Sequence, residues 1–323
     1  MTTSVRPGSC RRDVVATGAR WSRWVVVASV ALVSAVQLLP DPAYDGVVLG
    51  LVAAGLLAGL PHGALDHRIG AVLTGWPTSV VAAGYAMVAA LALLLLTVAG
   101  PFALVAVLTL SVAHFALGEL EAVRESTGWK PAGVQAVALG VAGTGALLLP
   151  LARAGPELAE VAASLSPGLG VLLADGGVRA ALAGVWGLAA VVAIVAALRA
   201  HQYRVALDVF LVGALGALAP PLVAFAVWFG GWHALRHCAR LLSVDTDSAA
   251  LLAQGQPARA IRVLARAALW PTVAAVVVLA GLIVRTATDP SAAVAQTLLV
   301  LLALTVPHML VVLWLDRRRP VRT

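Results

Sequence analysis

The chain has 323 residues, of which 61% are hydrophobic and 11% are charged, and its mean hydropathy is +0.96. A soluble domain does not need this much apolar surface, and the apolar residues form long runs of membrane-span length. A transmembrane β-barrel is excluded, because its strands alternate with period two and these runs do not. The composition therefore predicts an all-α, polytopic transmembrane helix bundle.

The formal net charge is +7, but its distribution does not indicate nucleic-acid binding. The basic residues lie in short segments between apolar runs, as orientation signals do. Residues 1–23 are interpreted as a cytoplasmic tail before a retained first span, since no convincing small-residue cleavage site follows. Residues 317–323 form a basic C-terminal tail, which leaves 24–316 as a single transmembrane domain.

We expect about ten spans, within a range of eight to ten. They cover residues 24–40, 46–62, 78–99, 101–119, 132–152, 178–198, 205–219, 221–238, 264–285 and 293–316. The division of 205–238 rests on Pro220-Pro221, because two successive prolines remove two backbone donors and favour a turn or a broken helix.

The basic residues give the orientation of these spans. With the N-terminus inside, only Arg153, Arg179 and Arg285 of the 22 Lys and Arg residues fall on the outer side. This bias predicts that both termini lie on the cytoplasmic side. The protein is expected to be a multi-pass protein of the cell (plasma) membrane. Residues 153–177 are expected to form an outer loop or a short interfacial helix, and 242–263 a helix on the inner surface.

Histidines end or interrupt several of the expected spans. The seven histidines are His62, His67, His114, His201, His233, His237 and His308. Even-numbered spans, which all run from outside to inside, contain five of them: His62, His114, His233, His237 and His308. Four separate helices therefore bring imidazoles to one layer near the cytoplasmic face.

The pair His233 and His237 has the spacing that places two imidazoles on one face of an α-helix. Polar groups inside a membrane are costly and usually face partners in the bundle. We therefore expect these two residues, with His62 and His114, to share a metal ion. His308 is expected to be a fifth ligand, a hydrogen-bond partner of a ligand, or part of a pocket.

Other polar and aromatic residues are assigned lesser roles. His67 and His201 lie in or beside basic loops and are expected to reach the headgroups or cap a helix. Asp66 and Asp208 are candidates to accept the second N–H of a metal-bound histidine. Glu119 and Glu121 are expected to be a solvated helix end. Trp232 is either a pocket residue or an interfacial aromatic.

Neutral nitrogen ligands without thiolates suit Fe(II), Zn(II) or Cu(II). A histidine site in a membrane is compatible with four kinds of protein. They are an oxygenase that acts on a lipid-like substrate, a haem-binding electron-transfer protein, a transporter that relays protons, and a metal-dependent hydrolase.

Three motifs carry a resemblance to a known family. They are Pro61-His62-Gly63-Ala64-Leu65-Asp66-His67, Ala113-His114-Phe115 and Phe229-Gly230-Gly231-Trp232-His233-Ala234-Leu235-Arg236-His237, and Pro307-His308-Met309 follows them. Together they resemble the Brp/Blh family of bacterial membrane β-carotene 15,15′-dioxygenases over residues 45–315. Two positions depart from the family pattern, with alanine at 116 in place of glycine and at 234 in place of serine.

The resemblance implies an activity and a site. The implied reaction is cleavage of β-carotene at its central double bond with O₂, giving two molecules of retinal at an Fe(2+) centre. The implied ligands are His62, His114, His233 and His237, with Phe115 and Trp232 near the substrate. The implied partners are the carotenoid, O₂, the lipid bilayer and a rhodopsin that receives the retinal.

Overall fold

The computed structural model describes residues 7–38, 41–286 and 288–318, and every regular element in that part of the chain is a helix. The predicted all-α class is confirmed. Among the described residues, seven helices are long and apolar enough to cross a membrane, or eight if a bent pair forms one span. The outer ends of both predicted tails, 1–6 and 319–323, lie outside the described residues, and α1 already begins at Pro7.

The chain divides into two compact units, which are described separately. The first unit comprises residues 1–60, 112–160 and 170–240, and the second comprises 61–111, 161–169 and 241–323. The boundaries fall inside continuous helices, so that some helices contribute residues to both units.

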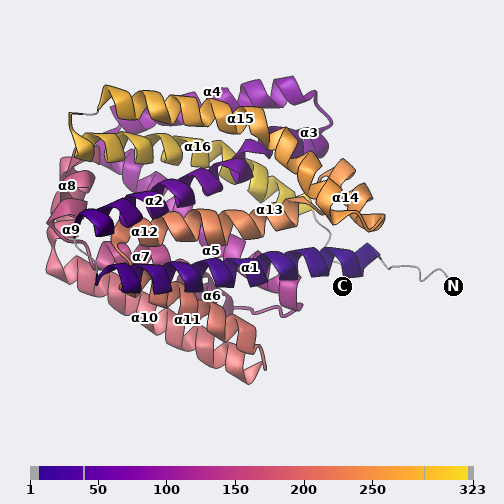
Figure 1. The fold of residues 1–323 in the computed structure, drawn as a ribbon, viewed down its shortest axis with the longest axis horizontal. Helices are drawn as coiled ribbons and strands as arrows, with labels where there is room; N and C mark the ends of the chain where they lie inside the picture. Colours follow the sequence, from indigo (N-terminus) through magenta and orange to yellow (C-terminus); the bar gives the residue numbers. More distant parts are fainter. Residues whose placement is uncertain (1–6, 39–40, 287, 319–323) are drawn as a thin grey trace. The chain divides into compact units, whose positions relative to one another are not determined.

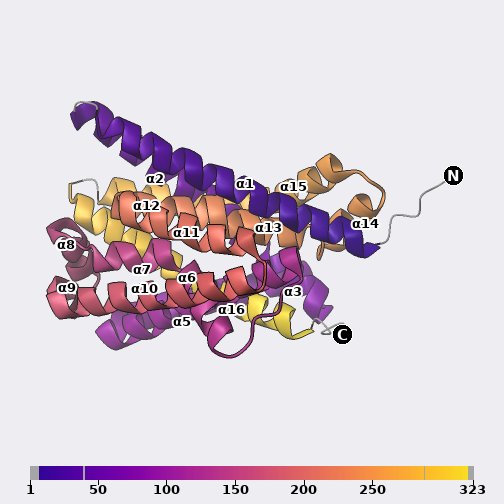
Figure 2. The same ribbon diagram turned by 90° about the horizontal axis from the view of Figure 1, so that it is seen from below.

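The first unit contains the helices that carry three of the predicted metal ligands. Its elements are α1 (Pro7–Val36), the greater part of α2 (Asp41–Ala64), the second half of α5 (Gly100–Thr127), α6 (Val134–Gly143), α7 (Gly145–Ala152), α10 (Gly176–Arg199), α11 (Tyr203–Leu218), α12 (Pro221–Val227), the π-helix η1 (Trp228–Ala234) and α13 (Leu235–Leu241). α10 packs along α6, α7 and α11, and α1 passes along α11 and η1 (Figures 1 and 2).

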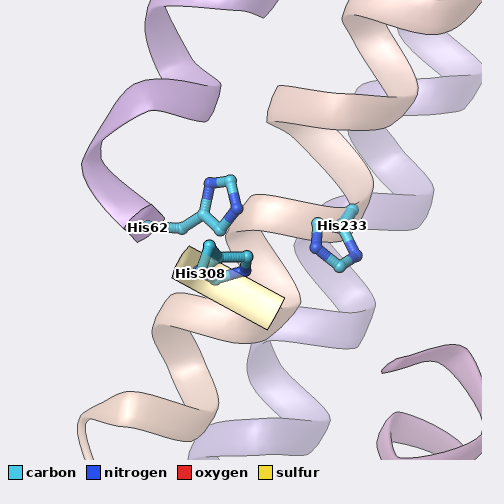
Figure 3. A group of neighbouring side chains, drawn as sticks. All are labelled: His62, His233 and His308. Carbon is cyan, nitrogen blue, oxygen red and sulfur yellow. The ribbon is translucent and has the colours of Figure 1, made fainter. Parts of the chain in front are cut away.

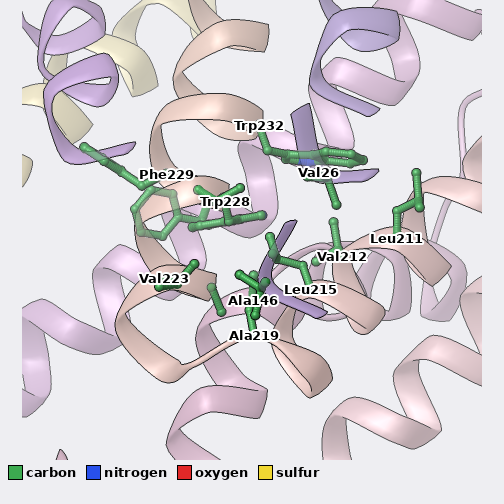
Figure 4. Packing of buried hydrophobic residues seen from close by; sticks show 14 residues of the cluster. Val26, Ala146, Leu211, Val212, Leu215, Ala219, Val223, Trp228, Phe229 and Trp232 are labelled. Atoms are coloured by element: carbon green, nitrogen blue, oxygen red, sulfur yellow. The ribbon is translucent and has the colours of Figure 1, made fainter. Parts of the chain in front are cut away.

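Two tryptophans form the centre of this first unit. Trp228 and Trp232 are fully buried and pack with Phe115 and Phe229, together with small and branched residues such as Val26 from α1 and Val212 from α11 (Figure 4). Burying an aromatic side chain removes a large apolar area from the surroundings and fixes the helices that contact it. The helix that carries His233 therefore lies in a buried cluster of the unit.

Glycines allow α2 to approach α12 and η1 closely. A Cβ atom added to Gly55 would lie 2.4 Å from the carbonyl oxygen of Ala226, and one added to Gly59 would lie 2.0 Å from the ring of Phe229. A Cβ atom on Gly230 would lie 2.0 Å from the carbonyl oxygen of Gly55. Small residues commonly mediate such backbone contacts between membrane helices. α2 is thereby fixed against the helix that precedes the histidine pair.

The second unit is built from fewer helices. It contains the end of α2, α3 (Asp66–Thr74), α4 (Thr78–Val98), the start of α5, α14 (Thr246–Ala253), α15 (Pro257–Arg285) and α16 (Pro290–Arg318). α16 packs against α3, α4 and α15 (Figure 1). α8 (Pro156–Leu165) and α9 (Pro167–Ala174) each cross the boundary between the units.

Several of the predicted breaks and loops are confirmed or corrected. α11 ends at Leu218 and α12 starts at Pro221, so the predicted break at the double proline is confirmed. The predicted span 132–152 is a pair of helices bent by 66°. The segment 153–177 contains α8 and α9.

The single inner-surface helix expected over 242–263 is wrong. Asp245 caps a short helix, α14, which ends before Gly255, and Gly255 has a φ of 71°. This left-handed conformation reverses the chain. The basic residues Arg259 and Arg262 then belong to the first turns of α15.

Candidate metal centre

The histidine pair lies at the end of a helix with an unusual winding. Residues from Pro221 to Leu241 are helical throughout, but the seven residues of η1 form a π-helix in place of the expected α-helix. In a π-helix each N–H bonds five residues back, and such turns are rare and frequent at functional sites. His233 lies in η1 and His237 in α13, and their rings are 6.2 Å apart and within 11° of parallel.

α5 brings a third imidazole to this pair. The ring of His114 lies 5.5 Å from the ring of His233, and both residues are buried. α5 continues to Thr127, so His114 lies in the middle of the helix and not near its end as expected. The predicted grouping of His114, His233 and His237 therefore occurs within the first unit.

Aromatic side chains enclose His233. Phe115 meets its ring edge-on at 4.8 Å, and Trp228 stacks on it at 5.9 Å with 29° between the planes. On α5, Gly118 approaches it so closely that an added Cβ would lie 3.4 Å from its Cε1. These contacts surround the imidazole with apolar groups, which exclude water from it.

The second unit holds the other two buried histidines. His62, at the end of α2, meets the ring of His308 from α16 at 4.7 Å and nearly at right angles (Figure 3). Nδ1 of His308 lies 2.8 Å from Oδ2 of Asp66. A carboxylate that is hydrogen-bonded to one ring nitrogen fixes the orientation of the ring, so that the other nitrogen points away from the carboxylate. Metal-bound histidines are commonly held in this way. Asp66 was expected in that role, and the contact that it makes is with His308.

Two histidines lie in different surroundings. His201 is exposed, has a φ of 55° between α10 and α11, and its Nδ1 lies 3.2 Å from the hydroxyl of Tyr203. His67 is half-buried at the start of α3. His62, His114, His233, His237 and His308 are all buried. Figure 3 draws three of these five, one of which, His233, belongs to the first unit.

The predicted roles of the acidic residues need correction. Asp208 on α11, a predicted partner of a metal-bound histidine, accepts hydrogen bonds from Arg23 and Arg236. Glu119 is buried and is not a solvated helix end, because α5 extends two turns beyond it. Its carboxylate accepts from Trp232 and Arg236. Glu121 is half-buried and pairs with Arg124 on the same helix.

The aromatic residues predicted to line a substrate pocket are both buried. Trp232 is fully buried, donates its indole N–H to Glu119 and lies beneath the guanidinium of Arg236. The structure thus places Trp232 inside a polar network. Phe115 packs between the rings of Trp228 and His233. Sequence reasoning missed the pairing of Arg236 with Glu119, although Arg236 lies within a quoted motif and Glu119 lies four residues after another.

The donor type fits a metal ion of intermediate softness. Three buried imidazoles come from α5, η1 and α13 in the first unit, and two come from α2 and α16 in the second. Neutral imidazole nitrogens suit Fe, Zn and Cu, whereas hard cations prefer oxygen ligands. A metal ion in such surroundings is bound through rings whose positions are fixed by packing, as those of His114 and His233 are within the first unit.

The fold and these residues define a class of protein: a helical protein with several apolar spans and buried histidines suited to a metal. The model of the family "Beta-carotene 15,15'-dioxygenase" matches residues 53–316, and the chain belongs to this family. The chain is similar to the probable beta-carotene 15,15'-dioxygenase Blh of Halobacterium salinarum, with 28% identity over 91% of each chain. No solved structure matches. The family makes this protein a carotenoid-cleaving dioxygenase.

Proposed function

We propose that this protein cleaves β-carotene at its central 15,15′ double bond with O₂, producing two molecules of retinal at an Fe(2+) centre. The observation that carries the proposal is the buried group of His114, His233 and His237 in a chain of the β-carotene dioxygenase family. The name of the Halobacterium salinarum relative supports the same substrate and bond.

The metal would be held by His62, His114, His233 and His237, with His308 as a fifth ligand. The first unit supplies three of these rings, and α2 carries the fourth. α2 is fixed by Gly59 against Phe229, and His62 follows three residues later, about one helical turn along. This continuity supports a common site. The bound Fe(2+) would supply the activation of O₂ that side chains alone do not provide.

The protein's own residues would bind and orient the substrate and exclude water. The polyene is apolar, and the cluster of Phe115, Trp228 and Phe229 offers apolar surroundings beside His233. An enzyme that holds a rod-shaped substrate in one position restricts the reaction to one bond. Cleavage by O₂ at a metal needs no side-chain nucleophile, and the buried carboxylates Asp208 and Glu119 are engaged by arginines.

The membrane arrangement belongs to the proposal as well. Eight of the ten predicted segments overlap helices, or a bent helix pair, of span length, and the other two, 205–219 and 221–238, overlap α11 and the α12–η1–α13 helix. We place both termini on the inner side of the plasma membrane. A carotenoid dissolved in the bilayer would enter between helices, and the retinal would pass to a rhodopsin in the same membrane.

The decisive experiment is aerobic conversion of β-carotene by purified protein loaded with Fe(2+). Retinal is expected as the product, and His233→Ala is expected to lose both iron and activity. A haem protein would show a Soret band, and a hydrolase would work without O₂. Protein that retains iron but produces no aldehyde from any carotenoid would contradict the proposal.

The contribution of His308 can be measured in the same preparation. If His308 binds the metal, His308→Ala should contain less iron than the wild type by elemental analysis. Unchanged iron with altered products would instead place His308 beside the substrate.

A further inference from the structure

A largely buried network of charged side chains and one tryptophan includes residues of the helix that carries the histidine pair. It consists of Arg23 from α1, Glu119 from α5, Asp208 from α11, and Trp232 and Arg236 from the η1–α13 helix. We call these five residues the arginine network. All belong to the first unit, and the proposed metal ligands include none of them.

Arg236 is the centre of the arginine network. Its Nε donates to the hydroxyl of Ser22 at 2.8 Å, one terminal nitrogen donates to Glu119 at 3.2 Å, and the other donates to Asp208 at 3.0 Å. Its guanidinium carbon lies 3.5 Å from the centre of the Trp232 ring. A planar guanidinium held by three acceptors and one aromatic face has a single orientation.

The remaining members close the network. Glu119 accepts the indole N–H of Trp232 at 2.8 Å with its second oxygen. Asp208 accepts two hydrogen bonds from Arg23, at 2.5 and 3.0 Å. Two guanidinium groups face two carboxylates, so the ionised network has no net charge. Charge balance is required here, because an uncompensated charge inside a membrane protein is costly.

The position of the network in the sequence ties it to the ligands. Arg236 follows His233 by three residues and immediately precedes His237. On α5, Glu119 is adjacent to Gly118, which abuts the ring of His233. The same turns of α5 therefore contact the η1–α13 helix through the imidazole of His233 and through the hydrogen bonds of Glu119 to Trp232 and Arg236.

We propose that Arg236 is a positioning residue for the metal centre: it fixes the backbone that carries His233 and His237, and Glu119 sets α5 and its His114 in register with that backbone. This inference rests on the proposed function, since it assumes that these histidines hold the metal. π-Helical turns are rare and occur frequently at functional sites. The arginine network supplies contacts to the η1–α13 helix from three other helices, α1, α5 and α11.

The alternative is that the network merely stabilises the fold. Buried ion pairs are weak evidence for stability, because desolvation offsets much of their attraction. The chain offers a matched comparison on the same helix: Arg240 is also buried and donates to Glu125 at 3.0 Å. A change at Arg240 alters a buried ionic contact of α13 and keeps the contacts of Arg236 with Trp232 and Glu119.

The test is binding of Co²⁺ to purified metal-free protein, followed by the visible absorption of the bound ion. Arg236→Lys keeps the charge but loses the planar fork and the stacking on Trp232. It is expected to weaken Co²⁺ binding by about 10- to 100-fold, the usual effect of removing a contact behind a ligand. The absorption bands should also shift, because the imidazoles change orientation. Arg240→Lys should leave the affinity within a few-fold of the wild type and the bands unchanged.

A second variant protects the test against misfolding. Glu119→Gln keeps an acceptor for the Trp232 indole but loses the charge that faces Arg236, and it should weaken Co²⁺ binding in the same direction. Wild-type affinity and bands in both Arg236→Lys and Glu119→Gln would overturn the proposal. Equal losses of affinity in Arg236→Lys and Arg240→Lys, with matching losses of thermal stability, would also overturn it. Wild-type protein that binds neither Co²⁺ nor Fe²⁺ would refute the metal centre itself.

Discussion

Gly55 offers a direct test of how tightly α2 must approach α12. A Cβ atom at this position would lie 2.4 Å from the carbonyl oxygen of Ala226, whereas ordinary contact begins at 3.4 Å. Gly55→Ala therefore requires the two helices to separate by about 1 Å, and neither partner is a flexible side chain that could move aside. Such overpacking typically costs about 1–3 kcal/mol.

A matched substitution isolates this cost. Gly50 lies on the same helix, and an added Cβ there meets nothing within 4 Å. Replacing glycine by alanine inside a helix gains about 1 kcal/mol from propensity alone. This gain is common to both variants, so Gly55→Ala should be about 1–3 kcal/mol less stable than Gly50→Ala.

The measurement is thermal unfolding in detergent, followed by the fluorescence of the tryptophans. Gly50→Ala should unfold at or slightly above the wild-type temperature, and Gly55→Ala clearly below it. His62 lies seven residues after Gly55, about 10 Å along α2, so displacement of this helix should also lower the iron content. Identical unfolding temperatures and iron contents for the two variants would refute the close contact.

Two further predictions concern residues outside the centre. Burial alone would raise the pKa of Asp245, but hydrogen bonds from Arg68 and Ser248 outweigh it and hold the pKa below its ordinary value of 3.8. The stabilisation by the ionised Asp245 carboxylate is therefore complete above pH 3.8 and is lost as the pH falls through the lowered pKa. Asp245→Ala should remove it at neutral pH, at a cost of about 1 kcal/mol. Faster amide exchange in α14 would measure this loss. His201→Ala should leave iron content and retinal formation unchanged, because this histidine is exposed beside Tyr203; loss of iron would contradict the assignment of ligands.

The sequence predicts the fold class and the buried histidines because both depend on strong local signals. Long apolar runs specify membrane helices, and a histidine inside such a run is costly unless it is used. The double proline likewise locates the end of α11. These inferences need no knowledge of which helices are neighbours.

The features that the sequence does not predict depend on distant partners. Glu119 looks like a solvated helix end until Arg236, 117 residues later, is placed beside it. Asp208 looks available to a histidine until two arginines from α1 and α13 occupy its oxygens. The π-helical winding of η1 is also invisible, because the spacing of His233 and His237 suits an α-helix equally well.

The π-helix makes the number of residues before His237 as important as their identity. A π-helical turn accommodates one more residue than an α-helical turn, since its bonds span five residues in place of four. Deleting one residue between Trp228 and Ala234 would let the segment relax to an α-helix without breaking the chain. The helix beyond would then keep its orientation, whereas deleting one residue of α12 would rotate it by about 100° and carry Arg236 and His237 away from their neighbours. Scanning this segment by single-residue deletion, and not only by substitution, would therefore reveal a determinant of activity that resides in backbone length.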